Sequence, residues 1–155
     1  MQQALSETSL TTDDLIIGFT RFSNTKQVTL QDVRSFALLT GDTNPIHMDE
    51  VFALNQGYKG PIAHGALILS LVTGLAYQLG IAKLGVVFTK IETTFSKPVY
   101  INDVIQVRIE ILDRRPYDDR QDEVLISALV KNQEKKPVQR GVWTARVPKA
   151  TTPQP

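Results

Sequence analysis

Two different periods of hydrophobic and polar residues divide the 155-residue chain into a helical part and a strand-rich part. Within LQDVRSFALL (30–39), apolar residues recur every three or four positions, which predicts an amphipathic helix. Thr29 and Asp32 have the spacing of a capping box, so this helix should begin at residue 30. Residues 49–54 favour a short second helix, and a glycine-rich loop is expected at 56–61.

The run ALILSLVTGLAYQL (66–79) is almost continuously apolar. A helix that spans a membrane needs roughly twenty apolar residues, so this run of about fourteen is too short. Its leucine and alanine content, and the closing Gly80, predict a helix that is buried on nearly every side. We therefore expect no contact with a membrane.

The rest of the chain has residue patterns that are typical of β-strands. Segments rich in β-branched residues, in part alternating between apolar and polar, occur at 86–95, 103–112, 123–132 and 138–147. Residues 19–28 could add a strand before the first helix. Short connections predict an antiparallel sheet, and the apolar helix must pack against it. The expected class is α+β: one domain over 1–155, with an antiparallel sheet wrapped around one long central helix and frayed ends at 1–13 and 150–155.

Composition narrows the classes of function. The chain contains no cysteine, which excludes disulfides, thiolate nucleophiles and cysteine-ligated metals. A net charge of +1, from 17 basic and 16 acidic residues, gives no general attraction to nucleic acid or to an anionic membrane. Residues 1–15 lack the basic start and apolar core of a signal peptide, so we expect a cytoplasmic protein.

The segment GDTNPIH (41–47) carries one of only two histidines in the chain. Gly, Asn and Pro favour a turn for reasons of backbone geometry alone, so Asp42 could simply cap it while His47 is a partly buried histidine. The alternative is that the turn folds Asp42 and His47 onto one small volume. An imidazole moves protons near neutral pH, and a carboxylate beside it can orient it or share one water. The residue pattern alone leaves both interpretations open.

The second histidine, His64, lies in GPIAHGAL (60–67), which leads into the apolar helix. The first amides of a helix have no partner within it and carry partial positive charge, which suits an oxygen that gains negative charge. Gly65 would let a ligand approach this backbone closely, or it merely allows close packing at the start of the helix. His64 either lines the same site or makes a structural hydrogen bond.

Other kinds of site have weaker support. Asp42, His47, Asp49 and His64 are of metal-ligating types but match no standard ligand spacing, so we expect no metal. The sequence contains no G-x-S-x-G for a serine hydrolase and no phosphate-cradling glycine loop. The basic residues between 131 and 149 are expected on solvated strand faces, with a landing site for a phosphate-bearing carrier as the alternative.

Three segments carry a family resemblance: FALLTGDTNPIH (36–47), GPIAHGAL (60–67) and FSKPVYINDV (95–104). They resemble the MaoC-like (R)-specific enoyl-CoA hydratases and dehydratases of the hotdog fold. The resemblance implies reversible hydration of trans-2-enoyl-CoA to (3R)-3-hydroxyacyl-CoA, a hydro-lyase reaction of fatty acid metabolism that needs no cofactor. It implies that Asp42 and His47 are the catalytic pair and that the amide of Gly65 binds the thioester oxygen.

The same resemblance places Thr73 where well-known members have a supporting serine, and Asn102 where the family often has glycine. It implies a homodimer with an acyl-CoA or acyl carrier protein thioester as its substrate partner. Two alternatives remain: a (3R)-hydroxyacyl-acyl carrier protein dehydratase of fatty-acid or polyketide synthesis, and a non-catalytic module that binds acyl thioesters. A pure binder has no need of a proton-handling pair, which favours an enzyme.

Overall fold

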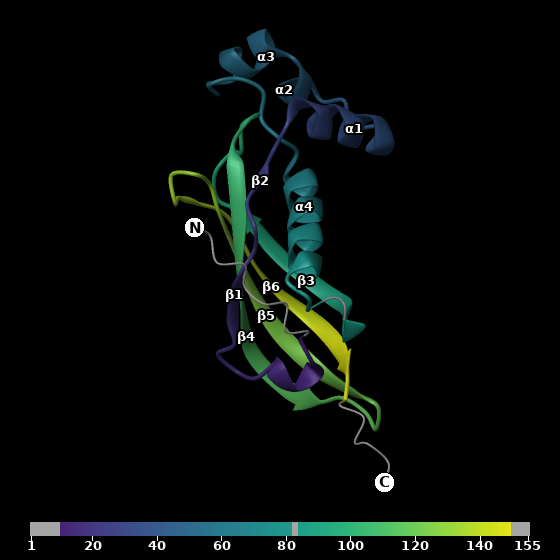
Figure 1. The fold of residues 1–155 in the computed structure, drawn as a ribbon. Coiled ribbons are helices and arrows are strands. Elements are labelled where there is room, and N and C mark those ends of the chain that lie inside the picture. The colour runs from purple at the N-terminus through teal and green to yellow at the C-terminus, as the bar shows by residue number, and fades with distance from the viewer. Residues whose placement is uncertain (1–9, 82–83, 150–155) are drawn as a thin grey trace.

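The computed structural model describes residues 10–81 and 84–149 of the chain (Figure 1). Its helices are η1 (Thr12–Asp14), α1 (Leu30–Thr40), α2 (Pro45–Met48), α3 (Glu50–Asn55) and α4 (Gly65–Gln78). Its strands are β1 (Thr20–Phe22), β2 (Lys26–Gln27), β3 (Val87–Phe95), β4 (Val104–Pro116), β5 (Gln121–Lys131) and β6 (Pro137–Pro148).

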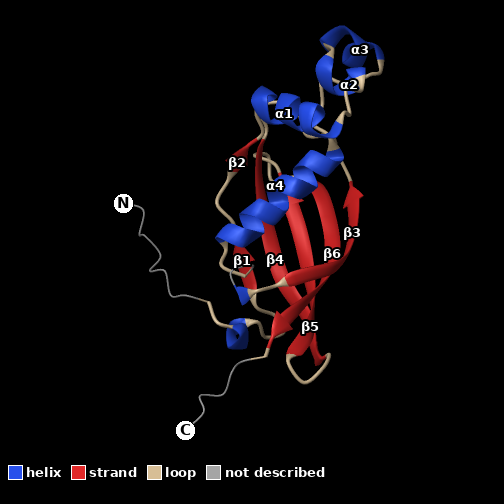
Figure 2. Ribbon diagram, turned by 90° about the vertical axis from the view of Figure 1, so that its right-hand side faces the viewer, coloured by secondary structure: helices blue, strands red, loops and turns tan. Residues whose placement is uncertain are grey.

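The strands form one antiparallel sheet in the order β1-β4-β5-β6-β3, and β2 pairs with the end of β4. Helix α4 lies along one face of this sheet, while α1, α2 and α3 gather at one end of the molecule (Figure 2). The expected α+β architecture, an antiparallel sheet around one long helix, is confirmed.

The core lies between α4 and the inner face of the sheet. Buried side chains alternate with less buried ones along much of β4, β5 and the second half of β6, and Trp143 is fully enclosed. From the helix side, Leu67, Ile68, Val72 and Leu75 pack into this layer. Complete burial of an aliphatic side chain contributes roughly 1.5–3 kcal/mol, so this contact between helix and sheet is the main source of stability.

Helix α1 begins and ends close to the predicted positions. The amide of Asp32 donates to Thr29 Oγ1 at 3.1 Å, and the amide of Thr29 donates to Asp32 Oδ2 at 2.8 Å, which completes the predicted capping box. Gly41 ends the helix in the left-handed conformation (φ 77°), which glycine adopts without steric cost.

The possible strand over residues 19–28 is two short strands instead of one. Between β1 and β2, Ser23 turns its hydroxyl into the sheet, where Oγ accepts a hydrogen bond of 3.1 Å from the amide of Val107. A side-chain acceptor thus takes a place in the ladder, and the strand is interrupted there.

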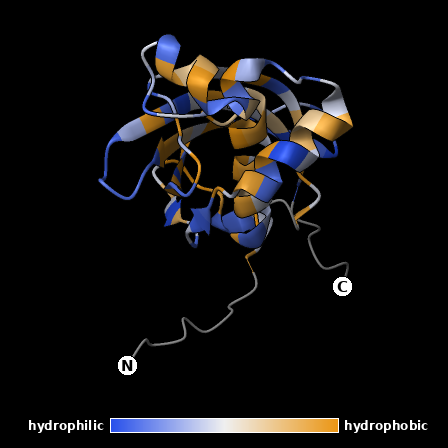
Figure 3. Cartoon of the chain, turned by 90° about the horizontal axis from the view of Figure 1, so that it is seen from above, coloured by the Kyte–Doolittle hydropathy of each residue, from blue (hydrophilic) through white to orange (hydrophobic). Residues whose placement is uncertain are grey.

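Helix α4 begins at Gly65, one residue before the predicted start, and the prediction that it is buried on nearly every side is wrong. Ala66, Ser70, Gly74 and Tyr77 form an exposed stripe along it. Hydrophobic and hydrophilic bands accordingly alternate along the helices in Figure 3. Within this one chain the sheet covers only one side of the helix.

The expectation of a frayed end over 1–13 does not hold for residues 10–13. Leu10 packs against the core, and η1 is closed by Thr11 and Asp14, whose side chain accepts from the amide of Thr11 at 2.7 Å. Residues 1–9 and 150–155 lie outside the described part of the chain. Among the described residues, no helix is long and apolar enough to cross a membrane.

Candidate active site

The segment GDTNPIH forms a tight corner between two helices. After Gly41 closes α1, the side chain of Asn44 accepts a hydrogen bond of 3.1 Å from the amide of Ile46 and caps α2. Pro45 occupies the first helical position, where its missing N–H costs nothing. The turn expected from the sequence therefore contains a short helix, and that helix carries His47.

The ring of His47 is oriented by the main chain. Its Nδ1 lies 2.7 Å from the carbonyl oxygen of Ile62. Because a carbonyl can only accept, Nδ1 must carry the proton, and Nε2 of the neutral ring retains its lone pair. Burial holds the pKa of His47 below its ordinary value near 6.5, although its bond to the Ile62 carbonyl opposes this shift. His47 is therefore a neutral base with a defined tautomer around pH 7.

Asp42 lies close to His47, which is the alternative that the family resemblance favoured. A carboxylate oxygen of Asp42, a ring nitrogen of His47 and a ring nitrogen of His64 all lie within 4.8 Å of one another. The side chain of Asp42 is exposed, and its Oδ1 accepts a bond of 3.3 Å from the amide of Asn44. The carboxylate of Asp42 and the imidazole of His47 are therefore close neighbours.

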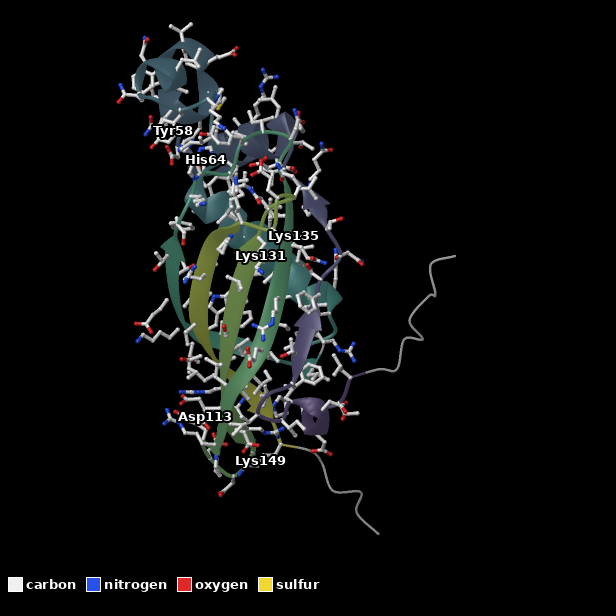
Figure 4. All side chains as sticks on the ribbon, turned by 90° about the vertical axis from the view of Figure 1, so that its left-hand side faces the viewer. Tyr58, His64, Asp113, Lys131, Lys135 and Lys149 are labelled. Atoms are coloured by element: carbon white, nitrogen blue, oxygen red, sulfur yellow. The ribbon has the colours of Figure 1, made fainter. Side chains whose placement is uncertain are left out.

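His64 contacts both Asp42 and His47. It is only 2% exposed, its Nε2 donates to the backbone carbonyl of Asp42 at 2.9 Å, and its ring stacks on that of His47 with centroids 3.8 Å apart. Figure 4 places His64 at the same end of the molecule as Tyr58. These contacts fit the structural hydrogen bond that was one of the two expectations for this residue. Through them His64 sets the positions of both members of the pair.

The first turn of α4 exposes uncapped amides beside this cluster. His64 is the N-cap residue, but its side chain makes no capping bond. Among the described residues, the amides of residues 65–67 have no acceptor, whereas that of Ile68 bonds to the carbonyl of His64 at 3.1 Å. Free amides and the helix dipole together make this end of α4 a place for a developing negative charge.

Gly65 allows close packing at the start of α4. Its backbone is ordinary helix, but a Cβ built on it would lie 3.0 Å from the ring of Phe95. The aromatic ring of β3 therefore rests directly on the start of α4, and it is half exposed. Of the two expectations for Gly65, the structure contains close packing at the start of the helix, and approach of a ligand stays a prediction.

A cavity of about 310 Å³ opens next to the pair. It is lined by His47, Tyr58, Ile62, Ala63, Gly65, Ile68, Phe95, Ser96, Lys97, Pro98, Val99, Val138 and Gln139. We call it the His47 cavity. Most of its lining is apolar, which suits an acyl chain or a methylene-rich arm. Asp42 and His64 are not among its lining residues, so the cavity reaches the pair from the side of His47.

Within this one chain, Thr73 bonds into its own helix, and its supporting role stays a prediction. Its hydroxyl donates back into α4, to the carbonyl of Ser70 at 2.8 Å. It lies eight residues after Gly65, which corresponds to about 12 Å along the helix axis. Thr73 also does not line the His47 cavity.

The cluster of Asp42, His47 and His64 has the residue types of a metal site. One feature argues against that use. The rings of His47 and His64 lie with their centroids 3.8 Å apart and their planes inclined by only 32°. Rings stacked in this way do not aim their lone pairs at one point about 2.0–2.1 Å from both nitrogens, as zinc requires.

The sequence pattern does not predict Gln139 as a site residue, yet it lines the same cavity and is only 2% exposed. The signal that could have found it is a polar residue on an inward-facing position of β6. The position can be recognised only when the structure shows which side chains of β6 face inward.

Comparison with known proteins shows which family this chain resembles. Over 106 residues the chain is 34% identical to a 3-hydroxybutyryl-CoA dehydratase of Methylorubrum extorquens, covering 67% of this chain and 65% of the relative. An (R)-specific enoyl-CoA hydratase of Aeromonas caviae is 35% identical over 80 residues, covering 52% of this chain and 59% of the relative. The chain thus spans about three fifths of each of these relatives.

A solved structure of a monoamine oxidase regulatory protein from Archaeoglobus fulgius superposes with a TM-score of 0.85 at 28% identity. The match covers 92% of this chain and 99% of that one, which confirms the hotdog fold implied by the resemblance. The family model described as "MaoC like domain" matches residues 18–133. The chain therefore belongs to the MaoC-like family of hydratases and dehydratases.

Proposed function

We propose that this protein catalyses the reversible hydration of a trans-2-enoyl thioester to the (3R)-3-hydroxyacyl thioester, with coenzyme A as the preferred carrier. The observation that carries this proposal is the convergence of the Asp42 carboxylate and the His47 ring within 4.8 Å, next to a largely apolar cavity. Hydration needs a base for water, a proton for C2 and a site for the thioester oxygen. Under this proposal Asp42 and His47 supply the base and the proton, and the start of α4 supplies the site for the thioester oxygen.

In the hydration direction, Asp42 and His47 hold one water between them. His47 Nε2, left free by the bond from Nδ1 to Ile62, takes a proton as the water oxygen forms its bond to C3. The electron pair of the C2–C3 double bond moves toward the thioester carbonyl. C2 then receives one proton from the pair, so the residues end in their starting protonation state and no redox cofactor is involved.

The thioester oxygen gains negative charge during this step. The uncapped amide of Gly65 at the start of α4 is the donor that we assign to it, helped by the helix dipole. Loss of one such donor in other enzymes costs about 2.7–4 kcal/mol of transition-state stabilisation. Phe95 rests on this position and must turn aside when the thioester binds.

The names of relatives support the reaction but divide over the carrier. The relatives in Methylorubrum and Aeromonas act, by name, on CoA thioesters. A mitochondrial 3-hydroxyacyl-[acyl-carrier-protein] dehydratase of Arabidopsis thaliana is 28% identical over 81 residues. Dehydration of an acyl carrier protein substrate is therefore the second candidate, and the same site would perform it in reverse.

We also propose that the protein works as a homodimer joined through β3. This strand ends the sheet, and within the described residues its outer edge has no partner. Val87, Ile91 and Phe95 on it are 58%, 37% and 51% exposed. An exposed apolar edge strand favours pairing with another strand.

The test is incubation of the purified protein with crotonyl-CoA, with the loss of enoyl absorbance as the readout and chiral chromatography of the product. We expect turnover and the (3R) isomer. A matched series of four- to sixteen-carbon enoyl groups on coenzyme A and on acyl carrier protein identifies carrier and chain length. Tight binding of these thioesters without any turnover would replace the enzyme with an acyl-thioester binding module.

A further inference from the structure

Gln139 is a buried amide without an obvious purpose in an apolar layer. It lies on β6, opposite Phe95 of β3 in the sheet register, and lines the His47 cavity. It is 2% exposed, and its Oε1 has no hydrogen-bond partner among the described residues. A buried acceptor without a donor costs free energy that an apolar side chain of the same shape would avoid.

The orientation of this amide follows from its neighbour. The Thr93 hydroxyl donates to the carbonyl of Arg140 at 3.3 Å, so towards Gln139 its oxygen can only accept. The Gln139 group 3.1 Å from it is therefore the donating Nε2. Thr93 does not line the cavity, so the bond holds Nε2 at Thr93 and leaves Oε1 as the part of the amide without a partner.

The position of Gln139 relates it to the thioester site. Its strand neighbour Phe95 rests on Gly65, whose amide is assigned to the thioester oxygen under the proposed function, on which this inference also rests. An unsubstituted acyl chain offers no hydrogen-bond donor. The pantetheine arm common to coenzyme A and acyl carrier proteins does, because its first amide N–H is separated from the thioester sulfur by only an ethylene unit.

We propose that Gln139 is a specificity-determining residue whose Oε1 accepts a hydrogen bond from the first amide N–H of the pantetheine arm. The thioester is then held at two points, by its carbonyl oxygen at the start of α4 and by its carrier arm at β6. Two-point attachment fixes the direction in which the acyl group is presented to His47. It also rejects thioesters of simple alkyl thiols, which would leave the buried oxygen unpaired.

A purely structural role for Gln139 makes a different prediction. Trp143, further along β6, also has a buried Nε1 without a partner in the described part of the chain. Both groups could belong to a polar patch of the core that only stabilises the sheet. In that case, loss of the Gln139 amide would affect every substrate to the same extent.

Two synthetic substrates separate these roles: the crotonyl thioester of N-acetylcysteamine, which contains the first amide, and a crotonyl alkyl thioester in which methylenes replace that amide. We expect the wild-type protein to prefer the amide-containing thioester in kcat/KM by about tenfold, or about 1.4 kcal/mol. Gln139→Leu should reduce this ratio to about one. The buried carboxyl of Gln139→Glu, once protonated, can donate to Thr93 and keeps an acceptor oxygen, so this variant should retain most of the ratio.

Gln106→Leu is the matched control. Gln106 lies on β4, bonds to the backbone carbonyl of Ser23 at 2.7 Å and does not line the His47 cavity, so the ratio should stay at the wild-type value. If Gln139→Leu does not fold, Gln139→Met, which has similar length but no strong acceptor, provides the same measurement. Melting temperatures are recorded for all variants.

An unchanged ratio in folded Gln139→Leu, or equal losses with both thioesters, overturns the assignment and leaves the hydratase function intact. The absence of a preference in the wild-type protein also overturns it. If the wild-type protein hydrates neither synthetic thioester nor crotonyl-CoA, the proposed function fails, and the assignment of Gln139 fails with it.

Discussion

Replacement of the two members of the pair, singly and together, tests the centre of the proposed site. Asp42→Asn keeps the size of the side chain and an oxygen that can accept from the amide of Asn44, but it removes the carboxylate. His47→Gln keeps a donor for the Ile62 carbonyl without an ionisable ring. Both substitutions therefore remove proton transfer while they preserve the local hydrogen bonds.

The expected magnitudes separate chemistry from folding. A general acid or base typically contributes about 10²–10⁴-fold to the rate, or about 2.7–5.4 kcal/mol in the barrier. A neutral hydrogen bond contributes only about 0.5–1.5 kcal/mol to stability, and each variant can rebuild the one it disturbs. Because the two groups act on one water, the double variant should be scarcely slower than the slower single variant.

The assay measures kcat and KM with crotonyl-CoA, and the melting temperature, for the three variants and one control. The control is Asp49→Asn, which removes the same charge a few residues away. Asp49 Oδ1 accepts from the amide of Phe52 at 2.9 Å and caps α3, a role that asparagine fills equally well. Its kcat should equal that of the wild-type protein.

Two results would refute the reasoning. Full activity in either single variant, with a wild-type melting temperature, removes that residue from the chemistry. Rate losses that multiply in the double variant would show that Asp42 and His47 act independently rather than on one water. A turn that serves only to cap helices predicts a third pattern, with stability changes of about 1 kcal/mol and unchanged rates.

Four further expectations concern other parts of the molecule. Because burial lowers the pKa of His47, the unfolded chain takes up the proton at a higher pH than the folded protein does. Stability measured by denaturant unfolding should therefore decline as pH falls below about 6.5. The acid limb of the kcat/KM profile should also lie below that pH. Gly65→Val would force an aromatic ring off the start of α4 and displace the thioester, so kcat should fall about 100-fold or more with little change in melting temperature; near-normal turnover would place the carbonyl elsewhere. Light scattering should give twice the 17.3 kDa chain mass, and Ile91→Lys on β3 should shift it toward the monomer; a fully active wild-type monomer contradicts the dimer. A Cβ on Gly141 would lie 2.5 Å from the carbonyl oxygen of Glu92, so Gly141→Ala should lower the unfolding free energy by about 1–3 kcal/mol, and an unchanged melting temperature would contradict this packing.

The long elements were predictable because each is dominated by one periodicity or one kind of burial. The short ones were not. Helix α2 has only four residues, too few for any period to show, and Asn44 and Pro45 start a helix with the same residues that build a turn. The break between β1 and β2 depends on one hydroxyl of Ser23 that enters the ladder from the side, which no local pattern reveals.

Within the site, the residue pattern alone left the proximity of Asp42 and His47 open, and the family resemblance favoured it. Gln139 was not predictable, because Val138 and Gln139 are both buried and the pairing of β6 with β5 shifts in register nearby, between Val130 and Lys131. Because of this irregularity, the alternation of residues along β6 does not tell which side chains face the core, and Gln139 could equally be assigned to the outer face. The hydroxyl of Thr73 donates to the carbonyl of Ser70 within α4, a bond that the sequence pattern does not show.

The bond between His47 and the carbonyl of Ile62 also bears on how such a protein can diversify. Every residue type supplies a backbone carbonyl, so the tautomer of His47 does not depend on which side chain stands at position 62. Ile62 itself, however, lines the His47 cavity, which receives the substrate under the proposed function. Position 62 therefore uncouples selectivity from reactivity: mutation can reshape the pocket there while the base keeps its orientation. A saturation library at this one position should change the acyl preference with less loss of turnover than libraries at His47 or Gly65.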